Sequence, residues 1–138
     1  MHKFIIGLAL LASVVSANVA RAATPQDMLR DYEAAARKEA GDFKAGAGRG
    51  ESFFRTERAA PGKDKQACAG CHTADPRQSG KTRAGKTIEP LAPAANPARF
   101  TDAAKAEKWF GRNCNDVLGR ACSAGEKADF IAWLLTIK

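Results

Sequence analysis

The sequence is poor in the side chains that most often ligate metals: its 138 residues contain two methionines, two histidines and four cysteines. It also has only one long apolar run, which lies at the extreme N-terminus, at residues 4–15. A polytopic membrane protein is excluded because no second run approaches the length that a bilayer requires. A large multidomain enzyme is excluded because one domain typically takes about 100–200 residues. The apolar fraction of 45% argues against disorder along the whole chain.

The apolar run predicts a secretory signal peptide. A short positive segment, Met1-His2-Lys3, precedes it, and Ala20-Arg21-Ala22 fits the small-residue pattern of a cleavage site. We therefore expect a signal peptide at residues 1–22 and one exported, periplasmic domain at residues 23–138. After cleavage we expect no membrane span, because the run is too short to serve as a comfortable anchor.

Removal of the signal peptide changes the count of charges and ligands. Loss of Lys3 and Arg21 leaves 20 basic residues (22 − 2) against 15 acidic ones, a formal charge of +5. One histidine, His72, and one methionine, Met28, remain. A basic exported protein favours an acidic docking partner, whereas export makes a nucleic-acid partner improbable.

The apolar residues of the mature chain recur at helical spacing, and no segment alternates apolar and polar residues as a half-buried strand does. This pattern predicts an all-α fold. We expect a first helix that begins at the cap Thr24 and ends at Gly41, and a glycine-rich hinge before a short helical turn at Glu51–Arg55. Prolines and glycines predict irregular structure over Thr73–Arg99. Two further helices are expected, one capped by Thr101 and one by the capping box Ser123-Ala124-Gly125-Glu126.

The segment Cys68-Ala69-Gly70-Cys71-His72 is a C-x-x-C-H motif, which is the attachment signature of a c-type haem. One helical turn places two thiols for thioether bonds and the imidazole for proximal ligation of iron. A zinc site would need a fourth ligand, a thioredoxin-like pair would need a preceding strand, and a plain disulfide would leave His72 unexplained. The motif therefore predicts one covalent haem c.

The chain around this motif resembles the class I cytochromes c. Gly50 and Phe54 stand ahead of it like the N-terminal Gly-x-x-x-Phe contact of that family, and residues 128–135 (ADFIAWLL) resemble the C-terminal helix that crosses the contact. Pro90 and Leu91 resemble the proline–leucine pair whose carbonyl holds the proximal imidazole. The resemblance implies a small helical fold wrapped around the haem.

The distal ligand of the iron is unusual, because no methionine follows the motif and the mature chain has no second histidine. Met28 is favoured as a core residue of an amphipathic helix, and lysine would need deprotonation and burial. Asn113 shares a helix face with Trp109 and Phe110, whereas Asn115 lies on another face. Iron ligation would satisfy a buried Asn113 amide, and a helix C-cap is the alternative role. Trp109 and Phe110 either line the pocket or pack in the core.

The segment Trp109–Cys122, with Glu126–Asp129 and Gly85–Ile88, resembles the Sphaeroides haem protein family of oxygen-binding monohaem cytochromes c. In that family the distal ligand is an asparagine immediately before a disulfide cysteine, and the related cytochromes c″ have histidine there. The resemblance implies that Asn113 is the distal ligand and that Cys114 pairs with Cys122. This disulfide would stiffen the ligand helix or would itself be redox-active.

The resemblance also implies a function. An amide oxygen is a hard donor that suits ferric better than ferrous iron, so reduction should release Asn113 and open the site to O2, NO or CO. We expect an electron carrier without enzymatic activity, whose partner is acidic and is a dihaem or membrane b-type cytochrome. The alternative is a haem enzyme that acts on O2, NO, hydroxylamine or peroxide.

Overall fold

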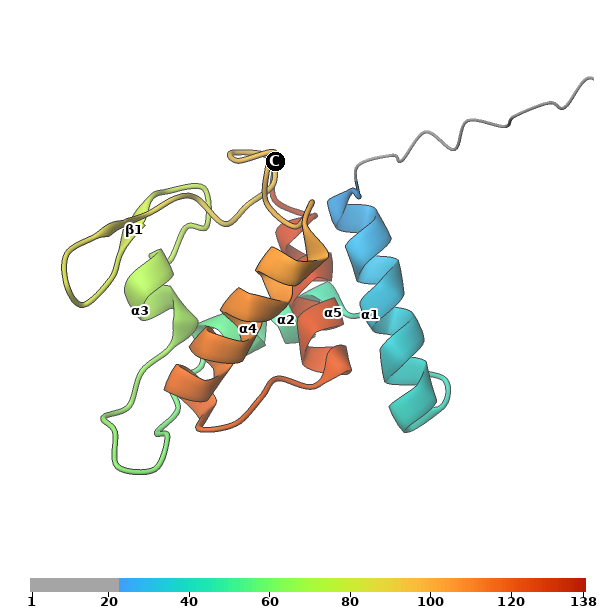
Figure 1. The fold of residues 1–138 in the computed structure, drawn as a ribbon, viewed down its shortest axis with the longest axis horizontal. Coiled ribbons are helices and arrows are strands. Elements are labelled where there is room, and N and C mark those ends of the chain that lie inside the picture. The colour runs from blue at the N-terminus through green and yellow to red at the C-terminus, as the bar shows by residue number, and fades with distance from the viewer. Residues whose placement is uncertain (1–22) are drawn as a thin grey trace, which may run out of the picture.

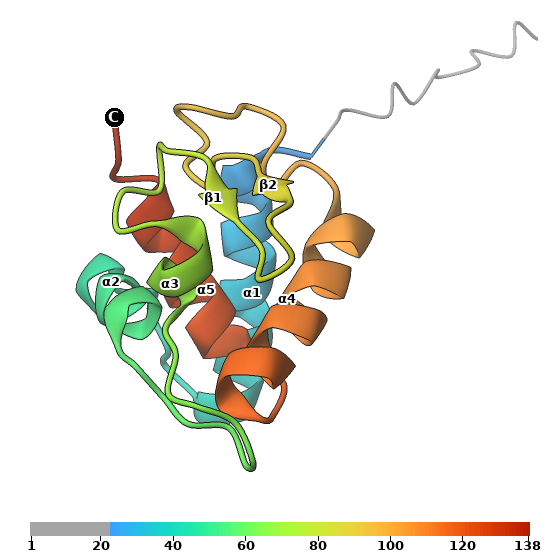
Figure 2. The same ribbon diagram turned by 90° about the vertical axis from the view of Figure 1, so that its left-hand side faces the viewer.

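The computed structural model describes residues 23–138, and the predicted signal peptide at residues 1–22 lies outside them. Five helices and a small antiparallel hairpin form the regular structure of the described residues. Figures 1 and 2 show how these elements are arranged. In chain order they are α1 (Pro25–Ala40), α2 (Ala47–Arg55), α3 (Cys68–His72), β1 (Gly80–Lys81), β2 (Thr87–Ile88), α4 (Ala103–Leu118) and α5 (Ala124–Leu134). The prediction of a helical fold is confirmed, apart from the two-residue strands, which are too short to show a period of two in the sequence.

The helix ends follow local capping chemistry. Thr24 and Ser123 both form capping boxes, in which the side chain accepts from the third helical N–H and the acidic residue there binds back to the cap. The prediction that Thr101 caps α4 is wrong: Asp102 is the N-cap, and its carboxylate accepts from the backbone N–H of Lys105. Either residue type can cap a helix, so the sequence alone did not separate neighbouring positions. Gly119 ends α4 with a φ of 70°, which only glycine adopts easily.

The second helix begins earlier than predicted. Gly48 and Gly50 lie inside α2 and not in a hinge before it. Gly50 is buried, and a Cβ at this position would run into the carbonyl oxygen of Asp129 in α5. The glycine therefore serves close packing of α2 on α5, which outweighs its poor intrinsic helix propensity.

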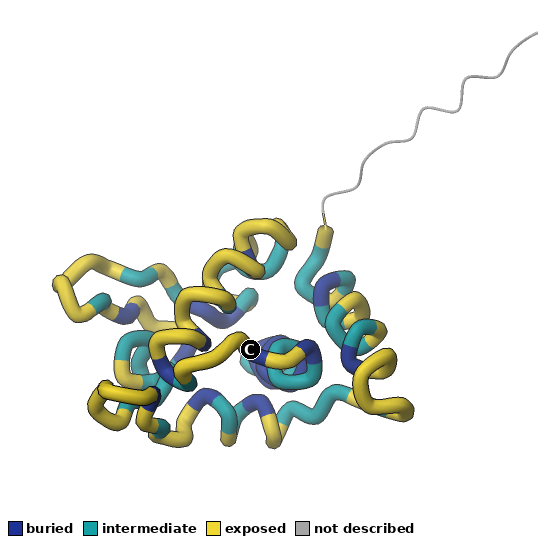
Figure 3. Tube along the Cα trace, turned by 60° about the horizontal axis from the view of Figure 1, so that its bottom comes forward, coloured by how far each residue is buried: buried dark blue, intermediate teal, exposed yellow. Residues whose placement is uncertain are grey.

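The core is organised around α5, which packs against both α1 and α2. The largest fully buried side chains are Phe54 of α2 and Ile131 and Leu134 of α5. Figure 3 shows the buried part of the chain near the C-terminus in the middle of the molecule, with exposed segments around it. The Phe54 ring packs at a tilt against Trp133, with ring centroids 4.9 Å apart, so the Gly50–Phe54 contact with the C-terminal helix is present as predicted.

In Figure 2, α3 lies in front of α5, with α4 to its right and the β1–β2 hairpin above it. None of the helices within residues 23–138 has the length and hydropathy needed to cross a bilayer.

Candidate haem site

A cavity of about 480 Å³ lies between α3 and α4, a size in the usual range for small-molecule and cofactor sites. His72 of α3 and Asn113 of α4 both line it. Its lining is mainly apolar and includes Phe53, Phe100 and Phe130. An apolar cavity with a few convergent polar groups is the expected setting for a large, flat, mostly apolar cofactor such as haem.

The C-x-x-C-H motif forms the single turn of α3, which begins at Cys68 and ends at His72. Both cysteines are half-buried and unpaired, so their thiols are available for thioether bonds. Burial raises the pKa of the Cys68 thiol, and the nearby charge of Arg58 acts in the opposite direction. The hairpin backbone packs directly on the motif, because a Cβ at Gly80 would collide with the carbonyl oxygen of Cys71. This contact holds the turn in place from outside.

His72 is half-buried, and burial, followed by the positive charge of Arg99, lowers its pKa to about 4. The imidazole is therefore neutral at pH 7, which is the form that donates a lone pair to a metal. The predicted hydrogen bond from His72 to Pro90 is absent from the described structure. The Pro90 carbonyl instead accepts from Arg99 Nε at 2.7 Å and from Asn96 Nδ2 at 3.4 Å.

Asn113 lies well inside α4, whose C-cap is Gly119, so the alternative role of Asn113 as a helix cap is excluded. Its side chain lines the cavity, and its amide has no hydrogen-bond partner among the described residues. The expected burial of this amide is not found, because Asn113 is exposed in the described structure. Asn115 is exposed and does not line the cavity. Met28 is 4% exposed in the core cluster and also does not line it. An amide that lines the same cavity as His72 and has no partner among the described residues is available as a metal ligand.

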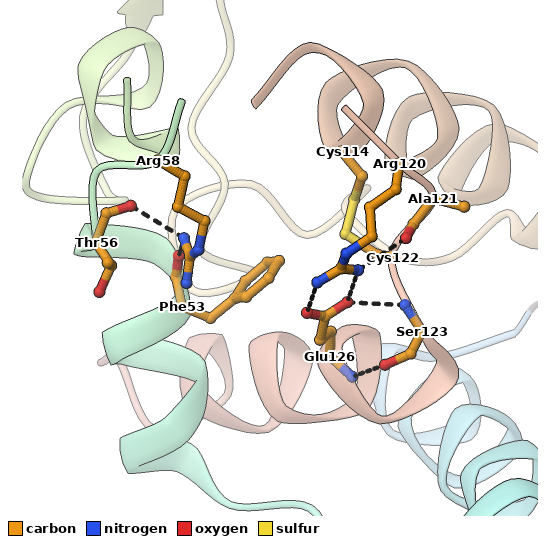
Figure 4. A network of polar contacts seen from close by, with 9 residues as sticks. All are labelled: Phe53, Thr56, Arg58, Cys114, Arg120, Ala121, Cys122, Ser123 and Glu126. Atoms are coloured by element: carbon orange, nitrogen blue, oxygen red, sulfur yellow. Dashed lines mark hydrogen bonds and ion pairs between the residues drawn. A yellow bond between two sulfur atoms is a disulfide. The ribbon is translucent and has the colours of Figure 1, made fainter. Parts of the chain in front are cut away.

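The predicted disulfide is present: Cys114 is bonded to Cys122, and Cys114 also lines the cavity. Beside it, Arg120 donates to both carboxylate oxygens of Glu126 at 2.7 and 2.8 Å (Figure 4). Glu126 also accepts from the Ser123 backbone N–H at 2.8 Å, which joins this ion pair to the capping box of α5. These contacts tie the last turn of α4 to the start of α5, directly after the candidate ligand.

Two further anchors hold α4. Tyr32 of α1 donates a hydrogen bond to Glu107 at 2.6 Å, and Lys127 of α5 donates to the same carboxylate at 2.8 and 2.9 Å. Near the other end, Gln66 Nε2 donates to the Asp116 carbonyl at 2.6 Å. Gln66 lies just before the C-x-x-C-H turn, so this bond links the chain at the His72 wall to the helix at the Asn113 wall.

Several residues that line the cavity were not identified from the sequence, among them Arg99 and Lys105. Arg99 lies in the irregular segment, where no periodicity shows which side chains turn inward. Lys105 could have been found, because it precedes Trp109 by four residues and so shares a helix face with it. Trp109 and Phe110 both line the cavity, and Phe110 also packs against the core cluster, so Phe110 has both of the expected roles.

The chain matches a known protein family over residues 40–134, described as a domain of unknown function, DUF1924. It is 46% identical to the cytochrome c-type protein SHP of Cereibacter sphaeroides over 134 residues, which cover 97% of this chain and 98% of that protein. It is also 50% identical to cytochrome c″ of Methylophilus methylotrophus over 88 residues, 63% of this chain and 61% of the relative.

Solved structures agree with these sequence matches. The structure of oxidised SHP, an oxygen-binding cytochrome c, superposes with a TM-score of 0.75 at 47% identity and covers 83% of this chain and 97% of that one. Oxidised cytochrome c″ from Methylophilus methylotrophus superposes with a TM-score of 0.73 at 41% identity, over 81% of this chain and 93% of that one.

Proposed function

Because the chain belongs to the SHP family of c-type cytochromes, we propose that it is a periplasmic electron carrier that releases a distal Asn113 ligand on reduction and then binds small gases. Its cofactor is one covalent haem c, as in SHP and cytochrome c″. We assign the thioether attachment to Cys68 and Cys71, the proximal ligand to His72 and the distal ligand to Asn113. The observation that carries the proposal is the unpartnered Asn113 amide in the cavity that His72 also lines.

Haem in such a site supplies reversible one-electron chemistry and, where a coordination position opens, binding of O2, NO or CO. The α3 turn contributes the two thiols and a neutral imidazole. The aromatic rings of Phe53, Phe100 and Phe130 in the cavity lining would offer apolar contacts to the cofactor. An apolar surrounding would disfavour the extra positive charge of the ferric state, and a neutral oxygen donor from Asn113 would offset part of that cost.

The proposed switch requires movement of one side chain only. The amide oxygen of Asn113 is a hard donor, so it would bind ferrous iron more weakly than ferric iron. The backbone of α4 is anchored by the Cys114–Cys122 disulfide at one end and by the Tyr32–Glu107 hydrogen bond nearer the other. Rotation of the Asn113 side chain therefore opens the site, while the helix that carries it stays in place.

The relative SHP is described as an oxygen-binding cytochrome c, which supports gas binding as the outcome of this opening. The basic mature chain and the cations on the cavity rim support an acidic redox partner. We assign that partner to the cytochromes, either a dihaem or a membrane b-type one, and O2, NO and CO to the open site. Export by the N-terminal segment supports the periplasm as the location.

Carbon monoxide binding to the anaerobically reduced holoprotein tests the proposal. A sharp shift of the Soret band on addition of the gas is expected, because a released Asn113 leaves the distal position accessible. The ferric protein should be low-spin and indifferent to the gas. A reduced low-spin spectrum that does not change with carbon monoxide would contradict the switch, because it requires a strong ligand that stays bound after reduction.

A further inference from the structure

A lysine ammonium lies behind one wall of the haem cavity. Phe110 of α4 lines the cavity, and Lys127 Nζ lies 5.8 Å from the centroid of the Phe110 ring. The same ammonium lies 5.2 Å from the centroid of the Tyr32 ring, which makes a T-shaped contact with Phe110. Tyr32 belongs to α1 and Lys127 to α5, so three helices meet at this cation. One aromatic ring therefore contacts a positive charge and also lines the cavity.

The ammonium is held by one carboxylate. Lys127 Nζ donates to both oxygens of Glu107 in α4, at 2.8 and 2.9 Å, and the Tyr32 hydroxyl donates to the same carboxylate at 2.6 Å. The Lys127 side chain is 15% exposed, whereas that of Glu107 is 51% exposed. Solvent therefore screens the negative charge of the pair more than the positive one. We call Lys127, Glu107 and Tyr32 the charge triad.

Stability alone does not explain a lysine in this place. Lys127 is the fourth residue of α5, close to the positive end of the helix dipole, which disfavours a cation. Removal of a charge from water is also costly, and a shielded ion pair often contributes no more stability than apolar side chains of similar volume. A cation that is kept at such a cost beside a cofactor cavity favours an electrostatic role.

A fixed charge near a redox cofactor shifts the redox equilibrium of that cofactor. Ferric haem carries one positive charge more than ferrous haem, so a nearby cation disfavours the ferric state. The effect is strong where water is scarce, and the Lys127 ammonium is shielded by two aromatic rings. The carboxylate of Glu107 acts in the opposite direction, but its exposure to solvent weakens its effect.

From these contacts, and on the basis of the proposed function, we propose that Lys127 tunes the redox equilibrium of the haem. Its ammonium stabilises the ferrous state and so increases the share of the protein that can bind a gas. Glu107 and Tyr32 are positioning residues, because they hold the ammonium against Phe110. An external one-electron donor is oxidised and the iron is reduced, while no bond to the charge triad forms or breaks. The cation thereby allows a weaker reductant to prepare the protein for gas binding.

Spectroelectrochemical titration of the holoprotein tests the proposal. At the potential at which wild type is half reduced, Lys127→Met should lower the ratio of ferrous to ferric protein about threefold or more, because it removes a shielded cation. The control Lys38→Met makes the same substitution at an exposed position of α1 and should change the ratio less than about 1.5-fold. At about 0.5 M salt the effect of Lys127→Met should remain, because salt screens shielded charges least.

Glu107→Gln should raise the same ratio about twofold, because it removes the negative charge and leaves the ammonium in place. The amide oxygen of glutamine can still accept from the Tyr32 hydroxyl, so the packing is largely kept. Both variants break the same ion pair, so loosened packing would move the ratio in one direction, whereas charge moves it in opposite directions. Lys127→Arg keeps the charge and should leave the ratio within about 1.5-fold of wild type.

Two results would overturn the role of Lys127. The first is an unchanged ratio in either Lys127→Met or Glu107→Gln, because neither charge would then act on the haem. The second is a change of the same sign in both variants, because the triad would then act only as a brace between helices.

Carbon monoxide spectra of the same samples separate this inference from the proposed function. Fully reduced Lys127→Met should bind the gas as wild type does, because the lysine acts on the redox equilibrium and not on the distal position. Variants that bind the gas normally, yet have the wild-type ratio, contradict the redox tuning alone. A wild-type protein that fails to bind carbon monoxide contradicts the ligand switch, whatever the ratios show.

Discussion

His72 and Asn113 line one cavity from two different helices, α3 and α4, and neither side chain forms a hydrogen bond within the described structure. Under the proposed function these two groups would ligate one metal from two sides. The first prediction tests this pairing.

Replacement of Asn113 by valine should convert the ferric protein to a high-spin state, because valine keeps the apolar character of the wall and removes the donor oxygen. The control is Asn115→Val in the same helix, which makes the same substitution, with nearly unchanged helix propensity, at an exposed position outside the cavity. Electron paramagnetic resonance and visible spectra report the spin state. A low-spin ferric Asn113→Val protein would show that another group is the ligand.

Replacement of Cys114 and Cys122 by alanine should lower the free energy of unfolding by about 2–3 kcal/mol, since the disulfide closes a short loop. Urea unfolding of the ferric holoprotein measures this change. The removal should also loosen the end of α4 next to Asn113 and so raise the high-spin fraction of the ferric protein. Thiol reduction of wild type should reproduce both effects and should leave the double variant unchanged.

Gly50→Ala should destabilise the protein by about 1–3 kcal/mol, because the new methyl group overlaps the Asp129 carbonyl and the Cβ of Trp133. Gly48→Ala in the same helix is the matched control, since a Cβ there meets nothing within 4 Å. The control should be neutral or stabilising by up to about 1 kcal/mol, the propensity difference between glycine and alanine. Thermal unfolding of both variants measures the two effects. Equal changes in stability for Gly50→Ala and Gly48→Ala would show that α2 does not pack closely against α5 at Gly50.

Glu126→Gln should lower the free energy of unfolding at neutral pH but not in acid. The hydrogen bond from Arg120 lowers the pKa of the Glu126 carboxyl, so the folded state favours its ionised form. A depressed folded pKa contributes stability above the unfolded value of about 4.3, and that contribution is lost as the pH falls through the folded value. The side-chain amide oxygen of glutamine can replace the carboxylate oxygen that accepts from the Ser123 N–H, so the capping box is largely kept.

Urea unfolding of wild type and Glu126→Gln at pH 7 and at pH 3 measures this effect. We expect a difference of about 1 kcal/mol or less at pH 7, because Arg120 is largely exposed, and a smaller one at pH 3. A difference in the free energy of unfolding that grows in acid would show that the folded state does not lower the pKa of the Glu126 carboxyl.

Several parts of the fold were predictable because their causes are local. The capping boxes at Thr24 and Ser123, the left-handed turn at Gly119 and the single turn of the C-x-x-C-H motif depend on residues within one or two helical turns. The start of α2 was not predictable in this way. Gly48 and Gly50 have low helix propensity, and the helix extends through them because Gly50 packs against a carbonyl of α5, far along the chain.

The candidate site divides along the same line. The motif Cys68–His72 and the lack of a later methionine were sufficient to predict a covalent haem with an unusual distal ligand, since both are properties of composition and of spacing within one helical turn. Only the tertiary structure placed the Asn113 amide in the cavity that His72 also lines. It also showed that the Pro90 carbonyl accepts a hydrogen bond from Arg99, and that Trp109 is exposed while it lines the same cavity. These outcomes depend on how α4 packs across the chain, and side-chain burial between distant segments is not encoded in the periodicity of either one.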